Sequence, residues 1–233
     1  MVRTISIALA FLFAGSALTS ARAQTSETVN IGGSSAVLLK PKAPRGSVIL
    51  MPGGNGSIGA TADGQITQLR GNQLVRTRNA YMARGLAVLV VDSNVNLASA
   101  VNYMAQIKRP VTVVATSRGT QRAAQGIAAG ARPDALVLTA GFLSPQSGAG
   151  INVMSVLGSP ALLPRTLVIH HRQDGCRFTL PTGVDPFVAW SGGRARVAWL
   201  SGGANEGDAC EARSYHGFNG LDGQVVGLAA GFR

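Results

Sequence analysis

The chain has 233 residues and a formal net charge of +11, with 46% hydrophobic and 13% charged residues. That balance excludes a disordered chain, and 30 glycines favour many tight turns over a helical bundle. The arginines that carry most of the charge are scattered, without a basic run or interleaved aromatics, so we predict no nucleic-acid partner.

The N-terminal segment has the features of an export signal. Arg3 precedes an apolar run over 5–18, and Ala21-Arg22-Ala23 offers the small-x-small pattern that signal peptidase cleaves. A membrane anchor is the alternative, but it needs about 20 apolar residues and this run is shorter. We predict a signal peptide over 1–23, one domain over 24–233, a periplasmic or secreted location and no stable membrane insertion.

Short apolar runs, each ending at a turn signal, predict a sheet. Two runs at 28–31 and 35–39 form a hairpin turned at Gly32-Gly33. Six later runs are continuous in Val, Ile, Leu and Ala, as in parallel strands covered on both faces. They are 47–51, 87–91, 111–115, 135–139, 166–170 and 196–200. Helix-length segments lie at 72–84, 97–107, 118–129, 184–190 and 217–232. This alternation predicts one α/β domain.

A serine follows the buried run at 111–115. Ala115-Thr116-Ser117-Arg118-Gly119 approximates the nucleophile elbow, Gly-x-Ser-x-Gly, in which a tight turn lifts the serine hydroxyl above the sheet edge. Ala115 stands at the first glycine position and adds one methyl group. We predict Ser117 as a nucleophile, with a helix cap as the alternative role.

A Pro-Gly-Gly loop follows the run at 47–51. Glycines let the backbone approach a substrate oxygen closely, and such a loop supplies a backbone N–H to an oxyanion hole. We predict the N–H groups of Gly54 and Asn55 as donors. The N–H of Arg118, the residue after the nucleophile, completes the set.

The same loop contains a competing pattern. Residues 54–59 match the Gly-x-Gly-x-x-Gly of dinucleotide-binding loops, and Asp92 ends a later strand. Asp92 lies farther along the chain than the ~20 residues of that fingerprint, and 60–64 make a poor helix start. We therefore predict no cofactor and interpret Asp92 as a turn residue.

An acid and a base follow in the order Ser, Asp, His. Asp174 lies in the loop after the run at 166–170, and His216 lies near the C-terminus. Histidine can take the serine proton and return it, while an aspartate fixes its tautomer. Asp208 is a rival acid, but its polar surroundings indicate a solvated loop. Asp174 and His216 are the predicted partners.

The other two histidines have a different predicted role. His170 and His171 end a strand too close to Asp174 in sequence to be its obvious partner, so we interpret them as wall or packing residues. No third ligand of suitable spacing accompanies them, and we predict no metal site.

Cys176 and Cys210 are the two cysteines of the chain. In an exported protein this number predicts a disulfide, with buried free thiols as the alternative. A bridge would join the loop of Asp174 to the loop of His216.

Taken in order, these motifs resemble the α/β-hydrolase superfamily. His216-Gly217-Phe218 is similar to the histidine loop of dienelactone-hydrolase-like and prolyl-oligopeptidase-like members. The resemblance implies a mostly parallel, twisted sheet flanked by helices, and acyl transfer to water through an acyl-serine without metal or cofactor. Two departures are Ala115 at the elbow and His171, where many members have glycine.

We therefore expect a serine hydrolase that cleaves small-molecule carboxylic esters. A peptidase or thioesterase shares the triad, and a non-catalytic exported binding protein on the same scaffold is the alternative from another class. Residues 140–165 leave little room for a cap domain, so we expect an open site. Arg118 and Arg172 would favour an anionic substrate group. The sequence does not indicate an oligomeric state.

Overall fold

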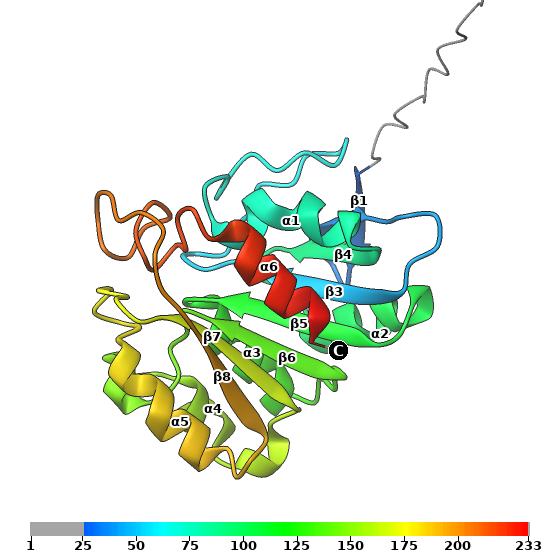
Figure 1. Cartoon of the computed structure of the whole chain (residues 1–233). Helices are drawn as coiled ribbons and strands as arrows, with labels where there is room; N and C mark the ends of the chain where they lie inside the picture. Colours follow the sequence, from blue (N-terminus) through cyan, green and yellow to red (C-terminus); the bar gives the residue numbers. More distant parts are fainter. Residues whose placement is uncertain (1–25, 233) are drawn as a thin grey trace, which may run out of the picture.

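A mostly parallel, eight-stranded sheet crosses the molecule (Figure 1). The computed structural model describes residues 26–232, and the predicted signal peptide lies outside them. The sheet order is β1-β2-β4-β3-β5-β6-β7-β8; β2 is antiparallel to both of its neighbours, and the other pairs are parallel. The strands are β1 (Ser26–Ile31), β2 (Ser34–Leu39), β3 (Gly46–Met51), β4 (Leu86–Val91), β5 (Val111–Thr116), β6 (Ala135–Thr139), β7 (Thr166–His171) and β8 (Ala195–Leu200). The predicted hairpin and the six predicted strands are confirmed.

The continuous apolar runs arise because both faces of the sheet are covered. In β3, Val48 and Leu50 pack into one core cluster, whereas Ile49 and Met51 pack into the other. Successive side chains of a strand point to opposite faces, so a strand that is buried twice must be apolar at every position.

In the described part of the chain, two α-helices cover one face of the sheet and four the other (Figure 1). The first face carries α1 (Gln73–Ala83) and α6 (Asp222–Gly231). The second carries α2 (Leu97–Ile107), α3 (Gly119–Ala128), α4 (Val153–Leu157) and α5 (Val184–Trp190). Within residues 26–232, no helix has both the length and the apolar character to cross a membrane.

The C-terminal helix differs from its prediction at one end. We predicted a helix over 217–232, but α6 begins at Asp222. Phe218 adopts a left-handed φ of 54° and Gly220 a φ of 80°, and both values break a right-handed helix. The preceding residues form turns instead, and these turns carry the histidine loop.

The topology brings four loops together at one edge of the sheet. The chain passes from β3 to β4 on one side, and then returns to place β5 on the other side of β3. In such sheets, ligands bind beyond the carboxyl ends of the strands where the strand order reverses. The loops after β3, β5, β7 and β8 all leave from that edge. The segment 140–165 contains only short helices, so among residues 26–232 the sheet edge carries no sizeable cap domain.

Candidate active site

Ser117 occupies a sharp turn between β5 and α3. Its φ is 51°, in the left-handed region that a serine rarely adopts. The turn is held by the Ser117 N–H, which donates to the Thr139 carbonyl at 3.0 Å, and by Thr120, whose N–H and hydroxyl both donate to the Ser117 carbonyl. Strained backbone of this kind is typical of functional sites. The conformation matches the elbow that the sequence predicted.

Two glycines allow the turn to pack against the loop after β3. A Cβ on Gly53 would lie 2.9 Å from the Ser117 Cβ, and a Cβ on Gly119 would lie within 2.7 Å of the Met51 and Pro52 carbonyl oxygens. Both positions therefore require glycine. Ala115, the departure from the elbow pattern, is fully buried within β5 and is accommodated there.

The loop after β3 presents unpaired backbone N–H groups. Among residues 26–232, the N–H groups of Gly54, Asn55 and Arg118 donate to no protein acceptor. Arg122 of α3 binds the carbonyls of Pro52, of Gly53 at 3.5 Å and of Gly54 at 3.2 Å. In a trans peptide the N–H points away from the carbonyl to which it is joined, so Arg122 directs the N–H groups of Gly54 and Asn55 to the opposite side.

Asp92 fixes the far end of this loop. Its carboxylate accepts from the Ile58 N–H at 3.1 Å and from the Ser93 N–H at 2.7 Å, as a turn residue at a strand end would. The helix that a dinucleotide fingerprint requires does not follow Gly59, since α1 begins only at Gln73. The loop therefore lacks the context of a pyrophosphate site.

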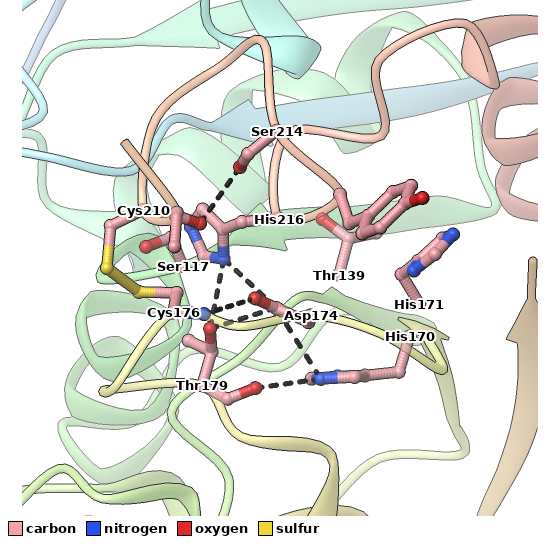
Figure 2. Close-up of polar contacts among 12 residues, drawn as sticks. Ser117, Thr139, His170, His171, Asp174, Cys176, Thr179, Cys210, Ser214 and His216 are labelled. Carbon is pink, nitrogen blue, oxygen red and sulfur yellow. Dashed lines mark hydrogen bonds and ion pairs between the residues drawn. A yellow bond between two sulfur atoms is a disulfide. The ribbon is translucent and has the colours of Figure 1, made fainter. Parts of the chain in front are cut away.

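His216 and Asp174 form a buried pair at the same edge (Figure 2). The His216 Nδ1 lies 3.1 Å from the Asp174 Oδ2, and the two residues are 6% and 3% exposed. The second oxygen, Oδ1, accepts from the Cys176 N–H at 2.9 Å. A carboxylate facing Nδ1 accepts its proton, which leaves Nε2 free to act as a base.

Ser117 and His216 line one cavity, with a volume of about 230 Å³. Among the hydrogen bonds of residues 26–232, none joins these two side chains. The fold thus brings all three predicted triad residues to one site and aligns the base with the acid. Hydrogen bonds between a nucleophile and its base are often long without substrate and tighten only when substrate binds.

Thr179 is a member of the site that no sequence motif predicted. Its buried hydroxyl lies 2.9 Å from the Asp174 Oδ2 and 2.9 Å from the His216 Nδ1. Its single proton goes to the carboxylate, so its oxygen can accept from the imidazole N–H. A threonine five residues after an aspartate gives no motif. Only the folding of the loop brings the hydroxyl back onto the pair.

His170 also lies closer to the acid than its sequence position indicated. Its Nε2 donates to the Thr179 carbonyl at 2.8 Å and lies 3.6 Å from the Asp174 Oδ2. Burial lowers the pKa of His170 to about 4, more than the nearby carboxylate raises it, so the ring is neutral at pH 7. His171 stacks on Tyr215, with 4.3 Å between the ring centroids. Both are buried packing residues, as predicted.

The predicted disulfide is present between Cys176 and Cys210. It joins the loop of Asp174 to the loop of His216 (Figure 2). Asp208, the rival acid, accepts from the Cys210 N–H at 2.7 Å, and its contacts among the described residues do not include His216.

Two predicted details differ from the structure. Arg172 lies over the Trp199 ring, 5.2 Å from its centroid, and lines neither of the cavities that contain Ser117. Asn55 also lines neither cavity, and its side chain accepts from the Ser57 N–H.

Within the described part of the chain, no group of three or more His, Cys, Asp or Glu side chains is arranged to hold a metal ion.

Comparisons with known proteins give matches among solved structures alone. No protein-family model matches the chain, and no curated protein sequence matches it. The protein TT1662 from Thermus thermophilus matches with a TM-score of 0.61 and 15% identity, covering 89% of this chain and 96% of that one. An alpha-beta serine hydrolase homologue from Coxiella burnetii matches with a TM-score of 0.58 and 13% identity, covering 88% and 95%.

A third likeness is to a solved dienelactone hydrolase. The dienelactone hydrolase from Anabaena variabilis matches with a TM-score of 0.54 and 15% identity, covering 90% of this chain and 95% of that one. The sheet order, the flanking helices and these likenesses together show that the chain has the α/β-hydrolase fold.

Proposed function

We propose that this chain is an exported serine hydrolase that cleaves carboxylic esters through an acyl-serine. The observation that carries the proposal is the buried His216–Asp174 pair, whose histidine lines the same cavity as Ser117, a serine with a left-handed backbone. Structural neighbours named as esterases and serine hydrolases support the reaction class. The disulfide supports an oxidising compartment, as export implies.

The proposed reaction has two halves, acylation of Ser117 and hydrolysis of the acyl-enzyme, and His216 takes and returns one proton in each half. Ser117 Oγ attacks the ester carbonyl carbon while His216 Nε2 takes its proton, and Asp174 stabilises the imidazolium. The tetrahedral oxyanion accepts from the free N–H groups of Gly54 and Arg118, which both line a cavity at Ser117. As this intermediate collapses, the bond between the carbonyl carbon and the alcohol oxygen breaks, and the leaving alcohol takes the proton from His216. Water then attacks the acyl-enzyme while His216 takes its proton, and the bond to Ser117 Oγ breaks, which releases the carboxylic acid and returns the proton to Ser117.

Active-site labelling and ester hydrolysis test this proposal together. The purified mature chain is treated with a fluorophosphonate and assayed on short-chain p-nitrophenyl esters, alongside Ser117→Ala and His216→Ala. We expect one label per chain, no label on Ser117→Ala, and a loss of several orders of magnitude in kcat for both variants.

A surface serine provides the matched control. The Ser159 hydroxyl accepts from the Ala161 N–H and only caps a short helix away from the cavities at Ser117. Ser159→Ala should therefore be labelled, and should turn over esters, as the wild type does.

The outcomes separate the alternatives. A non-catalytic binding protein on this scaffold would show neither labelling nor turnover, and that result would refute the proposal. Labelling without ester turnover, but with cleavage of a thioester or peptide, would retain the serine and overturn the ester assignment.

A further inference from the structure

Two cavities meet at Ser117, and their linings differ. Gly54, Ser117, Cys210 and Glu211 line both. The volumes are about 230 Å³ and about 290 Å³, just below the range of roughly 300–1,000 Å³ for drug-sized ligands. Each cavity therefore suits a small group on one side of a scissile bond at Ser117.

The larger cavity has an aromatic wall. Phe142 and Phe178 line it with stacked rings whose centroids lie 5.9 Å apart, and the Cys176–Cys210 disulfide forms another part of the lining. Phe178 is 38% exposed. An aromatic ring left open to water beside the nucleophile offers a stacking surface to a planar apolar group.

The lining of this cavity carries one positive and one negative side chain. Arg118 and Glu211 both line it and carry opposite charges. Arg177 is directed to the Phe178 ring, with its Cζ 4.7 Å from the centroid. This arrangement favours an uncharged aryl group over the anionic group that the sequence suggested.

The smaller cavity is the more polar of the two, and one residue of its lining carries a buried, unsatisfied acceptor. Gln73 lines it, is 2% exposed, and its Oε1 has no hydrogen-bond partner among the described residues. The Thr77 hydroxyl donates to the Gln73 carbonyl at 2.6 Å, so it accepts from the Gln73 Nε2 and fixes the amide orientation. A buried acceptor without a partner is costly, and a donor on a ligand would satisfy it.

We propose that the substrates are esters that join an uncharged aryl group, bound against Phe142 and Phe178, to a small hydroxylated group that donates to Gln73. The inference rests on the proposed ester hydrolysis and deepens it. Either the aryl group or the hydroxylated group can be the acyl part of the ester, with the other as the alcohol part. The test therefore includes esters of both kinds.

The test compares kcat/KM on matched esters. Glyceryl benzoate is compared with glyceryl acetate and propyl benzoate, and benzyl glycolate with ethyl glycolate and benzyl propionate. In at least one orientation, we expect the ester with both groups to exceed each partner by about five- to tenfold, the scale of one aromatic contact or one hydrogen bond. A 4-carboxybenzoyl ester should be poorer than its benzoyl counterpart.

Variants assign each preference to its cavity. Phe178→Ala should lower the aryl-to-alkyl ratio of kcat/KM by about five- to tenfold. Leu180→Ala, an exposed apolar residue of the same loop that lines neither cavity, is the matched control and should leave the ratio unchanged. Gln73→Met should remove the preference for hydroxylated esters while sparing the aryl preference.

The failure of this inference is distinct from the failure of the proposed function. Fluorophosphonate labelling of Ser117 with turnover of simple esters, but without aryl or hydroxyl preference in either orientation, overturns the inference and leaves the hydrolase intact. A preference for the carboxylated aryl ester overturns the assignment of an uncharged group. A preference that survives both Phe178→Ala and Gln73→Met overturns the assignment of the cavities.

Discussion

The hydroxyl of Thr179 lies 2.9 Å from the Nδ1 of His216. It also donates to Asp174, so one side chain contacts both members of the proposed acid–base pair. The Thr179 carbonyl accepts from His170, and its N–H donates to the Cys176 carbonyl, which together hold the backbone of this residue in place. Thr179 therefore limits the positions that the Asp174 carboxylate and the His216 ring can adopt.

Removing this hydroxyl should slow the chemical step more than it weakens binding. Thr179→Val keeps the shape and removes the bond to the carboxylate, a loss of about 1.5–3 kcal/mol for a charged partner, so kcat should fall about 10- to 100-fold. KM should change little because Thr179 lines neither cavity at Ser117. Thr179→Ser should restore most of kcat. Equal rates for Val and Ser would show that only packing matters.

The contrast between Thr179 and Ser117 shows what the sequence could predict. The apolar runs specify strands buried on both faces, and their turn signals place Ser117, Asp174 and His216 in segments that follow strands. Parallel strands then bring those ends to one edge. The contacts of Thr179, the approach of His170 to Asp174 and the N-terminal limit of α6 could not be predicted in this way, because each depends on how a loop folds back rather than on periodicity.

Arg122 should control the loop that supplies the proposed oxyanion donors. Arg122→Met removes the contacts to the Pro52, Gly53 and Gly54 carbonyls and frees that loop. Loss of one oxyanion donor costs about 100- to 1,000-fold in kcat, so a partly misplaced loop should cost at least about tenfold. Steady-state kinetics on a p-nitrophenyl ester measures the effect.

Arg132 provides a matched control for Arg122. It also binds backbone carbonyls, those of Ile127 and Ala131, but at the other end of the same helix. Arg132→Met should keep the wild-type kcat. A similar loss of kcat in both variants would indicate a general effect on α3 instead of a specific effect on the loop.

The disulfide should contribute to both stability and rate. Its cysteines are 34 residues apart, and closing a loop of that size in the unfolded chain stabilises the fold by about 3–4 kcal/mol. Replacing both cysteines by serine should lower the free energy of unfolding in urea by about that amount. Because the bridge joins the loops of Asp174 and His216, kcat should also fall. Unchanged stability and unchanged kcat would together reject this role.

His170 should make the fold less stable in mild acid. Burial lowers the pKa of His170 to about 4, whereas the unfolded chain has the ordinary value of about 6.5. Between these two values the unfolded state binds a proton that the folded state does not, so the free energy of unfolding falls as the pH falls from about 6.5 to about 4. The total loss is on the order of 3 kcal/mol.

His170→Gln keeps an N–H for the Thr179 carbonyl and cannot titrate in this range. The free energy of unfolding in urea, measured between pH 7.5 and pH 4, should therefore depend less on pH for His170→Gln than for the wild type. His171 and His216 are common to both proteins. Parallel curves would show that His170 is not the group responsible.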